Sequence, residues 1–120
     1  MADLQSDTFD WQPRLSERAL LGSMVFDIAK AKELIKATPH PVEEKPLSTF
    51  KPAYYLLSIK IDWEKAKTTD LKFPVIAAII DNQPTIIDGW HRYASALKQN
   101  LPTLPTVMLT PEELAQVKKR

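Results

Sequence analysis

The residues best suited to chemistry form the continuous segment Asp88-Gly89-Trp90-His91-Arg92. An apolar stretch that ends at Asp88 predicts a buried strand, and the residues after Gly89 predict a helix. The first N–H groups of a helix lack intrahelical acceptors and carry the positive end of the helix dipole, so they attract anions. His91 and Arg92 add donors there, and the guanidinium of Arg92 matches phosphate oxygens. The segment therefore predicts a phosphate site, beside which Asp88 would hold Mg²⁺ or accept a proton.

A purely structural interpretation of the same segment stays open. Asp88 would then cap the helix and Gly89 would form a tight turn. His91 would be a surface residue and Arg92 would form a salt bridge. Because a cation at a helix N-terminus costs roughly 0.3–1 kcal/mol, Arg92 is easier to explain if an anion binds there. For Trp90 we favour packing on a neighbouring loop over stacking on a base or covering a ligand.

The order of elements around this segment resembles the ParB/sulfiredoxin superfamily. A strand-turn-strand unit, a Gly-x-His-Arg sequence that opens an Ala-rich helix, and LPTLPTVML as the return strand cover residues 53–115. In this superfamily, ParB-type proteins bind CTP, sulfiredoxins use ATP to repair oxidised peroxiredoxin, and free-serine kinases carry Asp-Gly-His-His-Arg. The resemblance implies an α+β domain, a small mixed sheet with helices packed on it, that binds nucleotide phosphates at the start of this helix.

The resemblance also implies a ligand and a reaction. The expected ligand is ATP, ADP or CTP with Mg²⁺, or another phosphate-bearing small molecule. If the domain is an enzyme, the expected reaction is phosphoryl transfer or nucleotide hydrolysis, with Asp88 and His91 as catalytic residues and Asp88 as the Mg²⁺ ligand beside the phosphates. In the superfamily, a helix before the hairpin supplies further phosphate contacts. The residues expected to bind the nucleotide are Lys65, Lys67, Thr68, Thr69, Gly89, Trp90, His91 and Arg92.

Departures from the family pattern restrict the function. Trp90 stands where a sulfiredoxin has its cysteine, and the chain has no cysteine, so sulfinic-acid repair is excluded and no zinc, iron–sulfur cluster or haem is expected. A ParB-like nuclease or partition-related protein is an alternative, in which the same site would hold a DNA backbone. The formal net charge of +1 disfavours DNA as a partner. A second alternative is a noncatalytic interaction module whose site has decayed.

The chain of 120 residues has the length of one compact domain. Residues 1–52 are expected to form an N-terminal helical segment and a Pro-rich connector, and residues 53–120 the ParB/sulfiredoxin-like core. The N-terminal segment would pack over the sheet as an extra helix or mediate a homodimer. No apolar run is long enough to span a membrane, and the polar N-terminus is unlike a secretory signal, so the expected location is the cytoplasm.

Local patterns predict the individual elements. Helices are expected over 28–38, capped by Asp27, over 90–100, and after Thr110, where Glu113 completes a capping box; residues 14–22 are expected to add a helical turn. Strands are expected over 53–61, 74–80, 85–88 and 104–109, with a turn at 81–84 and a loop or extended connector around the prolines of 39–52. We expect His40 to be a solvated loop residue and favour surface positions for Asp62 and Glu64 over a role as base or metal ligand.

Overall fold

The computed structural model describes residues 18–21, 24–57, 59, 61, 64 and 73–119. The predicted phosphate-binding residues Lys65, Lys67, Thr68 and Thr69 lie outside the described residues, as does Asp62. Among the described residues, no helix has both the length and the apolar character needed to cross a bilayer.

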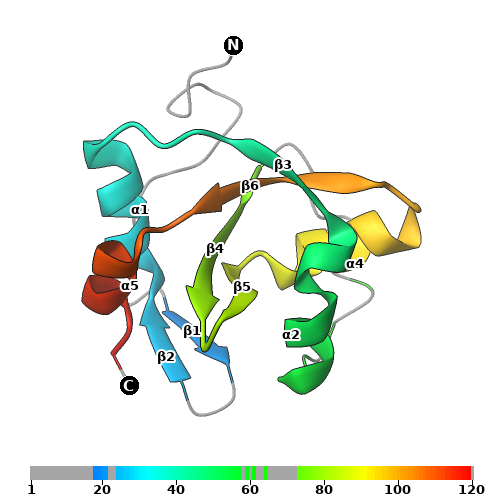
Figure 1. Cartoon of the computed structure of the whole chain (residues 1–120), viewed down its shortest axis with the longest axis horizontal. Helices are drawn as coiled ribbons and strands as arrows, with labels where there is room; N and C mark the ends of the chain where they lie inside the picture. Colours follow the sequence, from blue (N-terminus) through cyan, green and yellow to red (C-terminus); the bar gives the residue numbers. More distant parts are fainter. Residues whose placement is uncertain are drawn as a thin grey trace.

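A four-stranded mixed sheet forms the centre of the fold, with the strand order β3-β6-β4-β5. Strands β4 (Val75–Ile80) and β5 (Gln83–Asp88) form an antiparallel hairpin, as predicted. Its turn is made by Asp81 and Asn82, both with positive φ, which suits the tight turns that connect hairpins. Helix α4 (Trp90–Lys98) then crosses over to β6 (Thr103–Met108), which pairs parallel to β4 (Figure 1).

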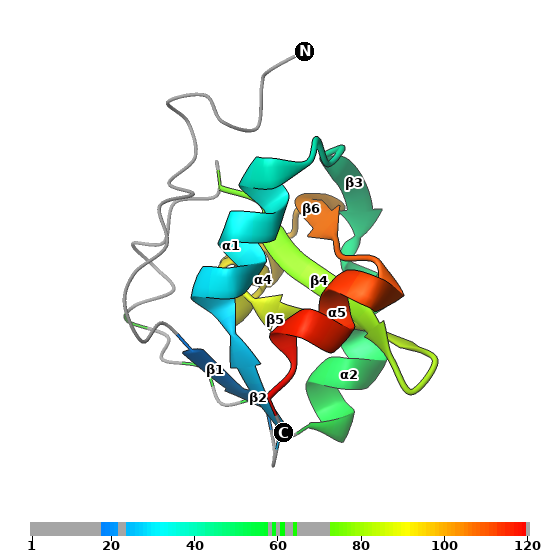
Figure 2. The ribbon, with the colours of Figure 1, turned by 90° about the vertical axis from the view of Figure 1, so that its left-hand side faces the viewer.

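The predicted α+β class is therefore confirmed, with helices on both faces of the sheet. Helices α1 (Ile28–Ala37) and α5 (Pro111–Val117) lie together on one face. Helix α4 and the short helix α2 (Lys51–Leu56) lie on the other face (Figure 2). A separate hairpin of β1 (Arg18–Leu21) and β2 (Met24–Asp27) leads into α1, and the chain after α5 returns beside β2, where the N–H of Lys119 donates to the carbonyl of Val25 at 2.7 Å.

Capping and apolar spacing fix helices α1 and α5 as the sequence predicts. The carboxylate of Asp27 accepts from the N–H of Lys30 at 3.0 Å and caps α1. The hydroxyl of Thr110 accepts from the N–H of Glu113 at 3.1 Å, while the Glu113 carboxylate accepts from the N–H of Thr110 at 2.9 Å. This reciprocal pair is the predicted capping box.

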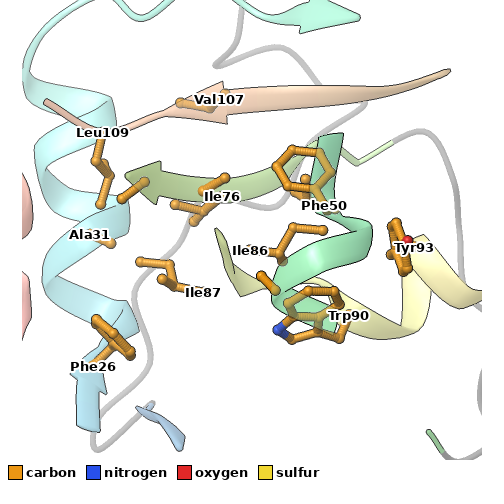
Figure 3. Close-up of a cluster of buried hydrophobic side chains, with 14 of the residues drawn as sticks. Phe26, Ala31, Phe50, Ile76, Ile86, Ile87, Trp90, Tyr93, Val107 and Leu109 are labelled. Atoms are coloured by element: carbon orange, nitrogen blue, oxygen red, sulfur yellow. The ribbon is translucent and has the colours of Figure 1, made fainter. Parts of the chain in front are cut away.

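The core lies between the sheet and the two helix layers. Figure 3 shows its side chains converging from β2, α1, the 3₁₀ helix η1 (Leu47–Phe50), the β4–β5 hairpin, α4 and β6. Strand β4 is buried along almost its whole length, as expected for a central strand covered on both faces. The largest fully buried side chains are Tyr93, Phe26, Phe50, Ile28, Ile35, Ile76, Ile86, Ile87, Leu104, Val75, Val107 and Val117.

The strand predicted over 53–61 is wrong: residues 51–56 form helix α2. Pro52 occupies the first turn of this helix, where a missing N–H costs nothing. Ala53 is buried, whereas Tyr55 and Leu56 are 67% and 75% exposed, so the alternation of apolar residues does not mark two faces of a strand. A short apolar run without a partner strand cannot be distinguished from a helix by periodicity alone.

Two further predictions in the N-terminal half are corrected. Residues 18–21 form strand β1, which pairs with β2, and not a helical turn, because hydrogen bonding across the hairpin overrides local helix propensity. The Pro-rich connector contains strand β3 (Glu43–Pro46), the 3₁₀ helix η1 (Leu47–Phe50) and the first residues of α2. Strand β3 tolerates Pro46 because it lies at an edge of the sheet, paired with β6 on one side.

Candidate functional site

The start of helix α4 is built around Gly89. This residue has φ 115° and ψ 21°, a left-handed conformation that side chains with a Cβ rarely adopt. A Cβ at this position would lie 2.7 Å from Cγ1 of Val75 and 3.1 Å from Nη1 of Arg92. The chain therefore requires a glycine here for its own packing, and the space above the glycine Cα is occupied by Val75 and by the guanidinium of Arg92.

The guanidinium of Arg92 is held at this helix start by the two residues that precede strand β4. Its Nη1 donates to the carbonyl oxygen of Pro74 at 2.8 Å, and its Cζ lies 5.8 Å from the centroid of the Phe73 ring. Within the part of the chain that the structure describes, no carboxylate pairs with Arg92. The salt bridge considered for Arg92 in the structural interpretation is therefore not found among these residues. Four of the five guanidinium N–H donors have no acceptor among the same residues.

Asp88 is the last residue of β5, opposite Ile76, and is half-buried. It does not cap α4, because Gly89 is the N-cap residue and no side chain caps that end. Among the described residues, the Asp88 carboxylate has no hydrogen bond or ion pair. The same residues contain no cluster of three His, Asp or Glu side chains that would hold a metal ion, so Asp88 fits Mg²⁺ only if ligand oxygens complete the coordination.

Trp90 and His91 complete the first turn of α4. The Trp90 side chain is buried, and its ring centroid lies 5.3 Å from that of Tyr93 and 5.9 Å from that of Tyr54. Packing of Trp90, the interpretation favoured from the sequence, is what the structure shows, although the neighbour is helix α2 and not a loop. His91 is half-buried beside Arg92 in the same turn. Asp88, Gly89, Trp90, His91 and Arg92 are thus brought together by the strand-to-helix junction.

Residues that position this site were not identified from the sequence. Phe73 and Pro74 fix the guanidinium of Arg92, and Val75 fixes the backbone of Gly89. The Phe-Pro pair before a buried strand gives no sequence signal for this role. Tyr54 covers Trp90 from α2, and a correct helix prediction over 51–56 would have been needed to find it.

A second polar cluster joins the connector to α5. His40 is buried, contrary to the predicted solvated loop position, because its ring lies between the end of α1 and the first turn of α5. Its Nε2 lies 2.8 Å from Oε2 of Glu113, and its Nδ1 lies within hydrogen-bond distance of the carbonyl oxygen of Thr38. Burial opposes ionisation of Glu113, but the N–H of Thr110 and the His40 ring outweigh it and lower the pKa of that carboxyl. This cluster fixes the position of α5.

The fold and site together define a small α+β domain with a cationic helix start at the end of a β-hairpin. Among solved structures, the chain is similar to sulfiredoxin from Arabidopsis thaliana, with 17% sequence identity and a TM-score of 0.39 over 63% of this chain and 93% of that chain. At this identity and TM-score the match carries no argument about function. No protein-family model and no curated protein matches the sequence.

Proposed function

We propose that the start of α4 binds the phosphate group of a small molecule, with a nucleotide as the leading candidate. The observation that carries this proposal is the placement of the Arg92 guanidinium, which Pro74 and Phe73 hold against the helix start without a described carboxylate partner. Because a cation here is unfavourable for α4 by roughly 0.3–1 kcal/mol, a bound anion would remove a cost that the free protein carries.

Electrostatics and geometry favour a phosphate over a neutral ligand. The first turn of α4 carries the positive end of the helix dipole, and the guanidinium adds a full positive charge beside it. The Pro74 carbonyl fixes the guanidinium before the ligand arrives, which lowers the entropy lost on binding. A planar guanidinium next to backbone N–H groups is the donor set that phosphate oxygens prefer.

The same residues give a role to each group if the domain catalyses a reaction. Phosphoryl transfer depends mainly on positioning and charge stabilisation, which Arg92 and the helix start would supply. His91 would donate to a phosphate oxygen. The carboxylate of Asp88, which has no partner among the described residues, would orient Mg²⁺ on the phosphates or accept a proton from the attacking group. ATP, ADP and CTP are therefore the ligands to test first.

Isothermal titration of the full chain with ATP, ADP and CTP, each with and without Mg²⁺, tests the proposal. Replacement of Arg92 by Ala should weaken binding by about 10- to 100-fold, because a charge-assisted hydrogen bond is lost. Lys98→Ala is the matched control: it removes one positive charge from the other end of the same helix and should change the affinity less than about twofold. The proposal is wrong if a folded sample binds none of the three at millimolar concentration, or if both variants bind equally.

A further inference from the structure

Two buried polar atoms on the first turn of α4 have no hydrogen-bond partner in the described part of the chain. They are Nε1 of Trp90 and the hydroxyl oxygen of Tyr93. The side chain of Tyr93 is fully buried, and Trp90 is 7% exposed. An unsatisfied buried donor costs on the order of 1–3 kcal/mol, and more than about nine in ten buried polar groups avoid that cost. Two such atoms on one helical turn therefore require an explanation.

Both atoms belong to residues of the first turn of α4, the turn that also carries Arg92. Trp90 and Tyr93 are three residues apart, so they are neighbours on the helix surface. Figure 3 shows both side chains extending from α4 beside α2. Arg92 reaches in another direction, toward Pro74 at the beginning of β4. The first turn of α4 thus carries one cationic side chain and two side chains with neutral donors.

The cover over these two atoms is weakly anchored. The Tyr54 ring of α2 lies 5.9 Å from the Trp90 ring and 5.6 Å from the Tyr93 ring, and Tyr54 is only half-buried. Helix α2 has six residues, of which only Ala53 is buried. Few buried contacts hold such a segment, so its local displacement requires less free energy than unfolding of the core. A shift of Tyr54 would open one side of the Trp90 and Tyr93 rings, while the buried Phe50 ring, 6.4 Å from that of Tyr93, would stay in place.

Tyr93 keeps its proton at every pH relevant to binding. Burial, with smaller contributions from the nearby Tyr54 and Tyr55 hydroxyls, raises the pKa of Tyr93 to about 12. Its hydroxyl is therefore a neutral donor, as the indole N–H of Trp90 always is. Neutral donors carried by aromatic rings suit a flat ligand ring that has acceptor atoms and no charge.

We propose that Trp90 and Tyr93 form a binding site for the heteroaromatic base of the nucleotide whose phosphate binds at Gly89–Arg92. The base would replace the Tyr54 ring against Trp90, and its nitrogen or carbonyl acceptors would receive hydrogen bonds from the two buried donors. This inference rests on the proposed function for the nature of the ligand, but the base contacts are independent of Arg92. It also explains why the free protein leaves two donors unsatisfied.

Titration of the full chain with three probes separates this inference from the phosphate site: a nucleoside triphosphate, its nucleoside, and inorganic tripolyphosphate. Tyr93→Phe removes only the hydroxyl and should weaken binding of the nucleoside triphosphate and the nucleoside by about three- to tenfold, with tripolyphosphate unchanged. Tyr55→Phe makes the same chemical change at an exposed ring and should alter none of the three affinities. Tyr93→Phe should also unfold at the same or a higher temperature than wild type, because an unsatisfied hydroxyl is removed.

The outcomes distinguish the two proposals. If tripolyphosphate binds with the same affinity as the nucleoside triphosphate, the base site is overturned and the phosphate site stands. Nucleoside binding that Tyr93→Phe weakens supports the base site even if tripolyphosphate does not bind. Equal nucleotide affinity in wild type and Tyr93→Phe overturns the inference, as does a Tyr93→Phe protein that is less stable, since the hydroxyl would then be satisfied within the free protein. If that variant does not fold, the indole N–H resonance of Trp90 in ¹⁵N-labelled wild type decides: it must shift on titration with the nucleoside, and an unchanged resonance overturns the inference.

Discussion

Replacement of Gly89 by Ala tests the geometry on which the site depends. The new Cβ would lie 2.7 Å from Cγ1 and 3.0 Å from Cβ of Val75, closer than non-bonded carbon atoms approach. The backbone would also keep φ 115°, which a residue with a Cβ rarely adopts. Left-handed strain costs about 1–2 kcal/mol and overpacking of a core about 1–3 kcal/mol, so we expect a total loss of about 2–5 kcal/mol. Typical domains have only about 5–15 kcal/mol of stability.

Equilibrium unfolding in urea, followed by far-UV circular dichroism, measures this loss as a lower midpoint at unchanged slope. A double-mutant cycle with Val75→Ala separates the two causes. Removal of the Val75 methyl groups relieves the shortest contact but not the backbone strain, so the double variant should be more stable than the sum of the single effects by about 1 kcal/mol. A Gly89→Ala protein within about 0.5 kcal/mol of wild type would refute the reasoning, because neither strain nor collision would then exist.

Three further predictions concern helices α1 and α5, which cover the other face of the sheet from α4. Thr110→Ala removes the hydroxyl that caps α5 and should lower the free energy of unfolding by about 1 kcal/mol in urea, whereas Thr110→Ser should retain most of it. Because the pKa of Glu113 is lowered in the folded state, its stabilising contribution is complete above the usual value of 4.5 and is lost as the pH falls through the folded pKa. The stability difference between wild type and Glu113→Gln should therefore shrink in acid, and a difference that grows toward low pH would contradict this sign. Ile35→Ala empties a fully buried position on α1 and should cost about 2–5 kcal/mol, measurable by thermal unfolding; a loss below about 1 kcal/mol would show that the core collapses around the gap.

The sequence correctly predicted those elements whose ends are fixed by capping or turn residues close to them in the chain. The cap at Asp27 and the capping box of Thr110 and Glu113 are short-range hydrogen bonds, and the structure shows both. The hairpin followed from the apolar run of 74–80 and the turn predicted over 81–84, although the turn is shorter than predicted because Gln83 and Pro84 already belong to β5. The strand predicted over 53–61 failed because a short apolar run does not by itself distinguish a strand from a helix, and Tyr55 and Leu56 of this run are exposed.

The site itself was predicted in part. Sequence spacing placed Asp88, Gly89, Trp90, His91 and Arg92 at one strand-to-helix junction, and the structure has them there. The prediction of Gly89 as a nucleotide-binding residue missed the intrachain reason for a glycine here: Val75 and the guanidinium of Arg92 fill the space that a Cβ would need. The contact between Gly89 and Val75 joins residues more than ten positions apart, and no single-sequence pattern reveals it.

The pairing of β3 with β6 has a consequence for the order in which the molecule assembles. Glu43 lies opposite Thr106, so this ladder closes a long loop of chain, whereas β4, β5, α4 and β6 follow one another within residues 75–108. Loop closure of that length is entropically costly, which favours early formation of the local unit and late addition of the edge strand. Pulsed hydrogen exchange during refolding would then protect the amides of β4 and β5 before those of β3. The strand-to-helix junction would be assembled before the outer strand joins.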